Sequence, residues 1–411
     1  MNPLLVSGFG TSINVDKRKL IITNRLKNEK LEFLPHKINH DNIIIDGYTG
    51  NITFESLRWL SKHDIPLTIL NWNGNLLLVA LPEGPKSGQL RIKQYQKYLN
   101  LGIRFEIACA IIDSKVKSTL NLLQELSLYY SDIDIASIKN SFAKEHSIFL
   151  SKINLEKQNK SELFSELLMY EGRIAIIYFD NIKKITEKLA PEFNFEGRTS
   201  KDTARNYNAS DEINALFNYG YAILESEIKK SVNSLGLDYT VGFLHEIYPY
   251  RTPLVYDLQE LFRWIIDYSI IQLLEDTPKL KKSDFILTEN YNIRLREKTA
   301  KLLIEKIHLN FNSKAPYKGK NYSFSNILHE NILRLANYIT DKTEKINFDV
   351  PRLEINRNDD VTLQEKILSM TPSERRKLGI NKSTLWYMKR NLKSGSKIKV
   401  YKKMLDKLDS K

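Results

Sequence analysis

The chain has 411 residues, a length that is typical of two or three domains. Hydrophobic residues make up 42% of it, which excludes a disordered protein, and the net charge of +13 indicates a polyanionic partner such as nucleic acid. A single cysteine, Cys109, excludes an intramolecular disulfide and a cysteine zinc site. The N-terminal segment lacks the pattern of a signal peptide, and no apolar run reaches the roughly 18 residues of a membrane span. We therefore expect a soluble intracellular protein without a membrane partner.

Short β-branched segments dominate the first 85 residues. They predict strands over residues 4–6, 20–23, 42–46, 66–70 and 76–80. Apolar residues at helical spacing over residues 52–60 predict one amphipathic helix among these strands. Residues 72–75 are typical of a tight hairpin turn before the last strand. The sequence therefore predicts a β-rich N-terminal domain with one helix over residues 1–85.

A helical pattern replaces the strands after residue 85. Apolar residues recur at helical spacing from residue 90 to about 341, which predicts a large all-helical domain over residues 86–345. The polar stretch 191–210 predicts a loop inside this domain, and residues 346–360 predict a linker after it. The fold class that we expect is α+β, with the strands at the N-terminus and the helices after them.

The C-terminal segment, residues 361–411, is strongly basic. It holds fourteen Lys or Arg and four Asp or Glu, so it carries +10 of the net charge of +13. Its pattern predicts three helices, over residues 363–370, 371–377 and 383–392, and a capping box at 371–374 opens the second. A Gly-containing turn at 379–381 separates the last two helices, as in a helix-turn-helix domain.

A helix-turn-helix places the start of its last helix against base edges and its basic side chains against phosphates. The residues that we expect to contact DNA are Arg375, Arg376, Lys377, Lys382, Ser383, Thr384, Tyr387, Lys389 and Arg390. The alternative interpretation is a basic three-helix tail that is merely solvated.

One histidine has carboxylates at suggestive spacing. Asp257 and Glu260 follow His245 by twelve and fifteen residues, and a separation of three on a helix places both carboxylates on one face. A histidine and two carboxylates that converge could hold a divalent metal. From these three residues alone, the more favoured interpretation is an Asp at a helix start and a surface ion pair between Glu260 and Arg263. The other six histidines have no partner pattern.

A further carboxylate, Glu171, precedes Gly172 inside a helical pattern. A glycine there costs about 1 kcal/mol relative to alanine, so it usually serves packing or the close approach of a ligand. This signal is weak when it stands alone.

Four segments in this order resemble the motifs of the CRISPR-associated adaptation integrase family, metal-dependent enzymes that insert spacers into arrays. They are residues 170–172 (Tyr-Glu-Gly), 214–221 (Asn-Ala-Leu-Phe-Asn-Tyr-Gly-Tyr), 242–246 (Gly-Phe-Leu-His-Glu) and 256–263 (Tyr-Asp-Leu-Gln-Glu-Leu-Phe-Arg). Residues 50–60 and 65–67 resemble the β-domain of the same family, so the resemblance covers roughly residues 1–340.

The resemblance implies a β-domain that takes part in dimerisation, a helical catalytic domain, and a metal held by Glu171, His245 and Glu260. Some relatives have Asp where this chain has Glu260, which leaves open whether Asp257 shares the ligation. If Asp257 only supports the ligands, its replacement by alanine is expected to be milder than loss of a ligand. The resemblance also implies a cytoplasmic, prokaryotic protein, and an archaeal source is favoured.

The basic C-terminal domain departs from the family's usual pattern and resembles casposases, the transposon-borne members that integrate the ends of their own mobile element. We therefore rank a casposase first and a CRISPR spacer-acquisition integrase second. A DNA-binding regulator with an inactive integrase fold ranks third, because the three expected ligands are all present.

Integration by such an enzyme is a transesterification, in which the 3′-hydroxyl of a donor DNA end attacks a target phosphodiester. A divalent ion lowers the pKa of that hydroxyl and stabilises the developing charge. Two carboxylate ligands favour Mg²⁺ or Mn²⁺, and an imidazole ligand tilts the choice toward Mn²⁺.

The expected partners are double-stranded DNA, both the element's terminal inverted repeats and the target site, and further copies of the chain. Insertion into two strands requires two active sites and hence at least a homodimer. Lys229, Lys230 and Arg205 are candidates for holding the DNA backbone, although for each of them an ordinary solvated charge is the favoured interpretation.

Overall fold

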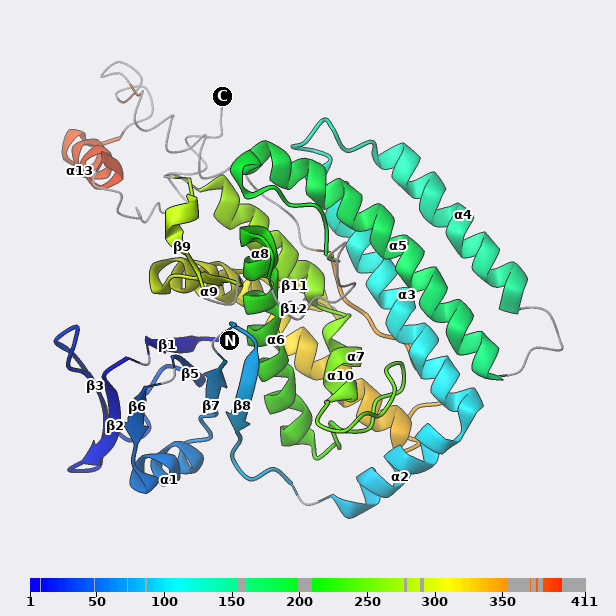
Figure 1. The fold of residues 1–411 in the computed structure, drawn as a ribbon, viewed down its shortest axis with the longest axis horizontal. Helices are drawn as coiled ribbons and strands as arrows, with labels where there is room; N and C mark the ends of the chain where they lie inside the picture. Colours follow the sequence, from blue (N-terminus) through cyan, green and yellow to red (C-terminus); the bar gives the residue numbers. More distant parts are fainter. Residues whose placement is uncertain are drawn as a thin grey trace. The chain divides into compact units, whose positions relative to one another are not determined.

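A computed structural model of the chain contains two four-stranded sheets and one helix in its N-terminal part (Figure 1). The first sheet has the order β1-β5-β7-β8, in which only β8 is antiparallel to its neighbour. The second has the order β4-β3-β2-β6, in which β2 and β6 are parallel. The strands are β1 (Pro3–Ser7), β2 (Thr11–Asp16), β3 (Lys19–Asn24), β4 (Glu29–Phe33), β5 (Asn42–Asp46), β6 (Gly50–Ile52), β7 (Leu67–Leu70) and β8 (Leu76–Ala80).

The chain divides into two compact units, Met1–Arg352 and Leu353–Lys411. The structure describes residues 1–7, 9–47, 49–71, 73–85, 87–153, 160–198, 209–276, 279–288 and 292–352 of the first unit, and residues 370, 375 and 380–393 of the second.

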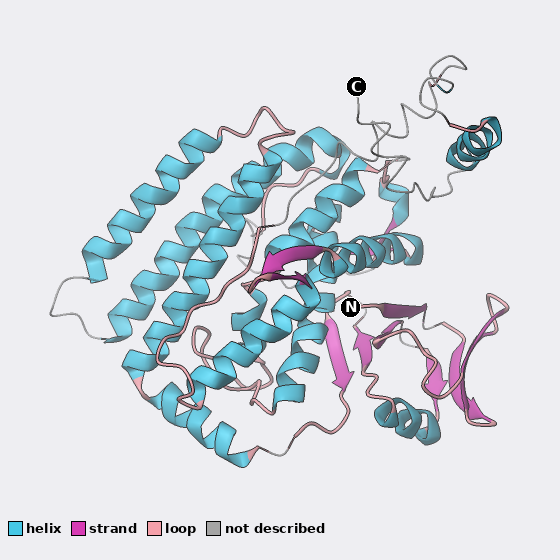
Figure 2. Cartoon of the chain, turned by 180° about the vertical axis from the view of Figure 1, so that it is seen from behind, coloured by secondary structure: helices cyan, strands magenta, loops and turns pink. Residues whose placement is uncertain are grey.

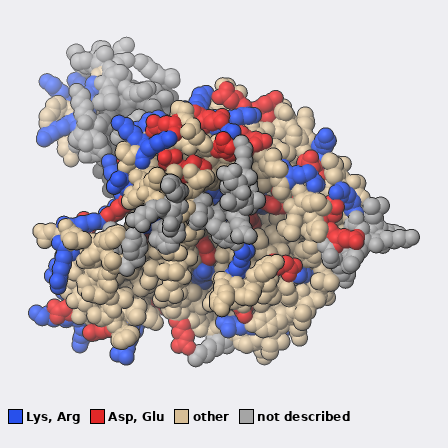
Figure 3. Space-filling model, viewed as in Figure 1, with Lys and Arg blue, Asp and Glu red and all other residues tan. Residues whose placement is uncertain are grey.

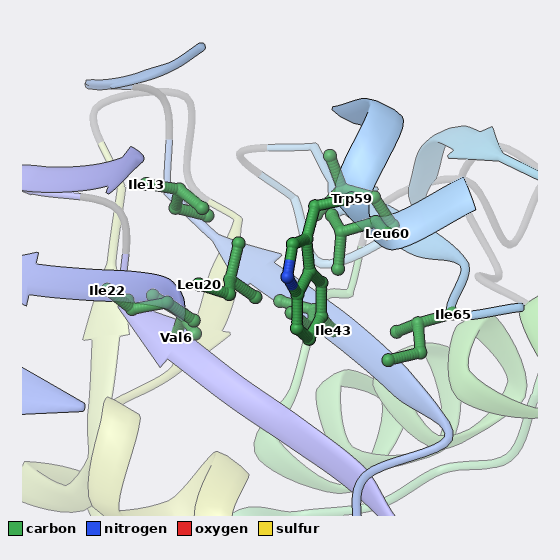
Figure 4. Packing of buried hydrophobic residues seen from close by; sticks show 9 residues of the cluster. Val6, Ile13, Leu20, Ile22, Ile43, Trp59, Leu60 and Ile65 are labelled. Carbon is green, nitrogen blue, oxygen red and sulfur yellow. The ribbon is translucent and has the colours of Figure 1, made fainter. Parts of the chain in front are cut away.

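The core of the β-rich part is contributed by both sheets and by helix α1 (Phe54–Lys62) (Figure 4). Trp59 and Leu60 of α1 pack with strand residues such as Leu20 and Ile43. The helix begins where the Thr53 side chain accepts a hydrogen bond from the Ser56 backbone N–H, which caps the first turn. The Trp59 indole donates to the Arg18 carbonyl at 2.9 Å, which ties α1 to the turn between β2 and β3.

The five strands, the helix and the hairpin predicted for residues 1–85 are confirmed, and β7 pairs with β8 across the expected turn. Strands β2, β4 and β6 were not predicted. Strand β4 (Glu-Lys-Leu-Glu-Phe) is almost wholly exposed and only Phe33 packs against the core, so pairing with β3 stabilises it more than its own pattern does. Strand β2 alternates polar and apolar residues, and its neighbours on both sides stabilise it.

Helices dominate the rest of the first unit, as predicted (Figure 2). They are α2 (Gly88–Leu99), α3 (Leu101–Leu126), α4 (Ile135–Ile153), α5 (Lys160–Leu189), α6 (Glu212–Leu235), α7 (Pro253–Gln259), α8 (Arg263–Glu275), α9 (Glu297–Asn312) and α10 (Phe324–Ile339). Two short hairpins, β9–β10 (Phe285–Leu287 and Ile293–Leu295) and β11–β12 (Lys314–Tyr317 and Lys320–Ser323), interrupt the region that was expected to be all-helical. None of the helices in the described ranges is long and apolar enough to cross a membrane.

Helix α6 lies at the centre of the helical part and is buried almost all round (Figure 1). Asp211 caps its start by accepting from the Asn214 N–H at 2.7 Å, and Gly236, at a φ of +79°, ends it in the left-handed conformation. The helix packs against α7, α8, α9 and α10, and it also contacts the β-rich part. There the Tyr219 hydroxyl donates to Asp46 of β5 at 3.3 Å.

The long helices α3, α4 and α5 lie side by side, with α5 packed against both of the others (Figures 1 and 2). This arrangement sets the middle of α3 beside the middle of α5, and α8 contacts both.

The second unit contains helix α13 (Lys382–Lys393), which confirms the last predicted helix. Leu385 and Met388 of α13 are buried, as are Ile380 and Met370 of the same unit. The first two predicted tail helices lie almost entirely outside the described residues, so the helix-turn-helix remains a prediction.

Candidate functional site

A cavity of about 660 Å³ lies among the helices and takes in both glutamates that the sequence singles out. Its walls include Lys115 from α3, Glu171 from α5, Glu260 at the end of α7 and Arg263 at the start of α8. Because these side chains come from four different helices, tertiary packing brings them together.

The ammonium of Lys115 contacts both glutamates. Its Nζ lies 2.6 Å from Glu260 Oε2 and also forms an ion pair with Glu171 Oε1. The Lys115 side chain is only 14% exposed. Burial acts to lower the pKa of Lys115, but the two carboxylates outweigh burial and raise the pKa, so the side chain is charged.

Glu260 lies between two cations. Its Oε1 accepts from Arg263 Nη1 at 2.7 Å, on the opposite side from Lys115. Burial acts to raise the pKa of Glu260, but Arg263 and Lys115 together lower it well below its ordinary value, so the carboxylate is ionised. The Glu260–Arg263 pair thus exists as the sequence suggested, but the Glu260 side chain is only 7% exposed, so the pair is not a surface one.

Asp257 supports the loop that carries His245. Its fully buried carboxylate accepts hydrogen bonds from the backbone N–H groups of Phe243, Leu244 and His245, and its Oδ1 lies 2.8 Å from His245 Nδ1. A side chain at residue 242 would not fit, because a Cβ on Gly242 would lie 2.8 Å from the Asp257 carboxylate. Gly242 therefore leaves room for the Asp257 carboxylate, and that carboxylate holds His245.

Asp257 and Glu260 were expected to lie on one face of a helix, but their side chains have different partners. Asp257 points to the His245 loop, whereas Glu260, just beyond the last residue of α7, faces the cavity. Burial acts to lower the pKa of His245, but its hydrogen bond and charge interaction with Asp257 raise the pKa above the ordinary value.

Gly172 lines the cavity next to Glu171. A Cβ added to Gly172 would meet nothing within 4 Å, so this glycine does not serve helix packing. It leaves the wall of the cavity open beside the Glu171 carboxylate.

The donor chemistry of these residues suits a divalent cation, although the described part of the chain holds no assembled group of three His, Cys, Asp or Glu side chains. Glu171 and Glu260 already share one cation, the Lys115 ammonium. Glu260 Oε2 is buried, and among the described residues the contact that it makes is the ion pair with Lys115 at 2.6 Å. His245 uses Nδ1 for Asp257, which leaves Nε2 as the nitrogen that could bind a metal.

A second polar layer lines the same cavity and was not predicted. Asp267 accepts from the hydroxyls of Tyr178 and Tyr221, both at 2.6 Å. The guanidinium of Arg263 lies 4.5 Å from the centre of the Tyr221 ring, a cation–π distance. Arg198 donates to Asn214 and Asn218 on α6. The Asn-Tyr-Gly-Tyr motif around residue 220 was the available signal for part of this layer.

The C-terminal candidates divide into exposed and engaged side chains. Lys382, Ser383, Thr384, Tyr387 and Arg390 are exposed on α13, and the Arg390 guanidinium lies 5.3 Å from the Trp386 ring centre. The engaged ones donate to backbone carbonyls of their own unit: Arg375 to Ile380 at 2.7 Å and Lys389 to Met370 at 2.9 Å. Arg376 and Lys377 lie outside the described residues.

The other basic candidates are ordinary structural charges where they are described. Lys229 pairs with Glu225 at 2.9 Å, and Lys230 donates to the Asp41 carbonyl at 3.1 Å. Arg205 lies outside the described ranges.

On the face shown in Figure 3, Lys and Arg side chains gather along the outer edge of the β-rich part. The turns after β2 and β3 carry exposed basic side chains, Lys17, Arg18 and Arg25, and Lys27 beside them forms an ion pair with Glu297.

Several known proteins are similar to this chain. The family described as CRISPR associated protein Cas1 matches residues 4–308. The CRISPR-associated endonuclease Cas1 1 of Archaeoglobus fulgidus is 26% identical over 331 residues, which cover 79% of this chain and 92% of that protein. The CRISPR-associated endonuclease Cas1 of Korarchaeum cryptofilum is 30% identical over 302 residues, which cover 71% and 84%.

One solved structure, a casposase bound to integration product, is similar with a TM-score of 0.77 and 36% sequence identity. The match covers 90% of this chain and 99% of that one, a larger share of this chain than either curated relative matches.

Proposed function

This chain belongs to the Cas1 family of CRISPR-associated proteins, and from that premise we propose that it is a DNA integrase of the casposase type. It would join the 3′-hydroxyl ends of a mobile element to target DNA by transesterification. The observation that carries this proposal is the 36% identity to a casposase over 90% of the chain. The strongly basic C-terminal unit, with exposed polar and basic side chains on α13, agrees with it.

In this proposal Glu171, Glu260 and His245 hold a Mn²⁺ or Mg²⁺ ion. The ion supplies a lowered pKa at the attacking hydroxyl and charge compensation at the phosphate. Arg263 keeps Glu260 ionised and fixes one of its oxygens at 2.7 Å, which leaves the other for the cation. Asp257 holds the His245 ring by Nδ1 and so orients the free Nε2.

Glu171 and Glu260 line a cavity of about 660 Å³, which offers room for the ends of the reacting strands. The partners in this proposal are the element's terminal inverted repeats and the target duplex. Residues of the C-terminal unit would select them, with Ser383, Thr384 and Tyr387 at base edges and Lys382 and Arg390 at phosphates. Because joining two strands needs two active sites, the working form would be at least a homodimer.

A second candidate is a CRISPR spacer-acquisition integrase. The names of the curated relatives favour it, since the proteins of Archaeoglobus fulgidus and Korarchaeum cryptofilum are both called CRISPR-associated endonucleases. The neighbouring genes separate the two candidates: inverted repeats and a DNA polymerase gene indicate a mobile element, whereas a repeat-spacer array indicates adaptation.

Strand transfer into a plasmid tests the proposed chemistry. Short duplexes that carry the element's ends, incubated with plasmid and Mn²⁺, should be joined by the wild-type chain. Glu171→Ala, His245→Ala and Glu260→Ala should each abolish joining but leave DNA binding within a few-fold, because the basic surfaces are unchanged. Lys229→Ala is the control, since Lys229 pairs with Glu225 and neither residue lines the cavity of Glu171 and Glu260. Joining at the wild-type rate by His245→Ala would contradict the proposed ligand set.

A further inference from the structure

Lys115 differs from Lys117, the other lysine of α3. Its ammonium contacts the two glutamates that line the cavity, and its side chain is 14% exposed. Lys117, two residues away on the same helix, is 68% exposed and pairs with Asp113 one turn back at 2.6 Å. Lys117 is an ordinary surface lysine, whereas Lys115 is mostly buried and neutralises two carboxylates.

Two neighbouring carboxylates that are partly shielded from water repel each other unless a cation compensates them. In this cavity the compensating charge comes from Lys115, which contacts Glu171 Oε1 and Glu260 Oε2. A divalent cation bound by both glutamates would need Glu260 Oε2, the oxygen that Lys115 contacts, because the other oxygen of Glu260 is engaged by Arg263. Lys115 and such a cation therefore compete for this oxygen of Glu260.

The two basic side chains of the site differ in how freely they can move. Arg263 is bound to Glu260 and also lies over the Tyr221 ring at 4.5 Å. Lys115 has a flexible four-carbon stem and holds the glutamates through a single point charge. Of the two, Lys115 can leave its carboxylates and remain within the cavity that it lines.

We propose that Lys115 is an exchangeable counter-ion: it keeps the Glu171–Glu260 pair together until a divalent cation takes its place, and it then presents its ammonium to the phosphate in the cavity. This inference rests on the proposed function. It adds a residue that would both tune metal affinity and contact the substrate.

Mn²⁺ binding to the full chain without DNA tests the first half, with free Mn²⁺ measured by electron paramagnetic resonance. Lys115→Met keeps an apolar stem of similar length and removes the charge. It should bind Mn²⁺ about tenfold more tightly than the wild type, because no ammonium has to be displaced. The matched control Lys117→Met should stay within about twofold, because its charge is exposed and screened. A folded Lys115→Met protein with unchanged or weaker Mn²⁺ binding would overturn the proposal.

Lys115→Arg decides the matter if Lys115→Met does not fold. A guanidinium binds two carboxylates more tightly than an ammonium does and is therefore harder to displace. This variant should bind Mn²⁺ at least about threefold more weakly than the wild type. Equal or tighter binding by a folded Lys115→Arg protein would count against an exchangeable counter-ion.

Strand transfer at saturating Mn²⁺ tests the second half. Lys115→Met should join DNA at least about tenfold more slowly despite its tighter metal binding, because the phosphate loses a charge-assisted contact. Lys117→Met should join at the wild-type rate. Unchanged joining by Lys115→Met would overturn the phosphate contact. If the wild type itself neither bound Mn²⁺ nor joined DNA, the proposed function would fall and this inference with it.

Discussion

Asp257 shows how much one buried carboxylate can organise. It is fully buried and accepts from three consecutive backbone N–H groups as well as lying 2.8 Å from His245 Nδ1. Because it accepts hydrogen bonds from so many buried donors, this carboxylate fixes both the path of the loop that carries His245 and the orientation of the His245 ring. The sequence predicts only that, if Asp257 supports the ligands, its loss affects strand transfer less than loss of a ligand does, whereas these contacts predict a large effect on folding.

Asp257→Ala should lower the free energy of unfolding by about 3–5 kcal/mol, because each buried donor left without an acceptor costs about 1–3 kcal/mol. Asp257→Asn keeps one acceptor oxygen and should cost about half as much. Urea unfolding measures both. Asp113→Asn is the control, since its carboxylate on α3 is 57% exposed and its replacement should change stability by less than about 0.5 kcal/mol. A loss as small for Asp257→Ala as for the control would show that the loop does not depend on this carboxylate.

The oxygen-rich ligand set predicts a specific metal dependence. EDTA should stop DNA joining, and Mn²⁺ should restore it at least as well as Mg²⁺, because an imidazole ligand favours Mn²⁺. Zn²⁺ should fail, because its preference for four tetrahedral ligands leaves too few positions for substrate oxygens. The measurement is plasmid joining after chelation and re-addition of each ion. Full activity in EDTA would remove metal catalysis from the proposal.

At the scale of secondary structure, the crossing of α6 and α8 depends on one glycine. A Cβ on Gly220 would lie 2.4 Å from Ile266 Cγ2, so the two helices can approach as they do only without a side chain there. The same crossing brings Tyr221 of α6 to the Asp267 carboxylate of α8 at 2.6 Å. The glycine therefore allows the second polar layer of the cavity to form.

Gly220→Ala should destabilise the protein by about 2 kcal/mol, because the overpacking cost exceeds the gain of up to about 1 kcal/mol in helix propensity. Gly172→Ala is the matched control inside α5, where a Cβ would meet open space. It should be neutral or stabilising by up to about 1 kcal/mol. Thermal unfolding of the two variants compares them directly. If both shifted stability by the same amount, close packing at Gly220 would not be the cause.

At the scale of the whole molecule, most of the net positive charge and the proposed metal ligands lie in different parts of the chain. Residues 361–411 carry +10 of the net charge of +13, whereas Glu171, His245 and Glu260 belong to the unit Met1–Arg352. In the proposed function, this division would separate general affinity for DNA from the groups that perform the reaction.

Deleting residues 361–411 should weaken DNA binding and flatten its salt dependence. If about six of the fourteen basic side chains contact phosphates, the log–log salt slope should change by roughly 5, at about 0.9 per phosphate. The truncated chain should still join generic ends at low salt, since no proposed ligand is lost. It should lose preference for the element's ends or target, because a good base contact is worth about 1–3 kcal/mol.

Integration-site sequencing at matched activity, together with salt titration of binding, measures both effects of the truncation. An unchanged site distribution with an unchanged salt slope would contradict a DNA-reading role for the C-terminal unit. It would shift the preference to a spacer-acquisition integrase.

Local patterns along the chain were enough to predict five strands, helix α1, the helical region and α13, because each depends on neighbours within a few residues. Strand β4 could not be predicted in this way, since its exposed, charged sequence becomes a strand only by pairing with β3. Glu171, His245 and Glu260 could also be singled out from the sequence, because each belongs to a short motif that resembles one of the family.

Contacts between distant segments required the folded chain. Lys115 lies 56 residues before Glu171 in the sequence, and nothing in its own segment marks it as the cation that both glutamates share. The ion pair of Glu260 and Arg263 was readable from their spacing, but its burial was not, because helices remote in the sequence cover it. Spacing restricts which neighbours on one helix can meet, whereas burial and charge compensation arise from the packing of several helices around one cavity.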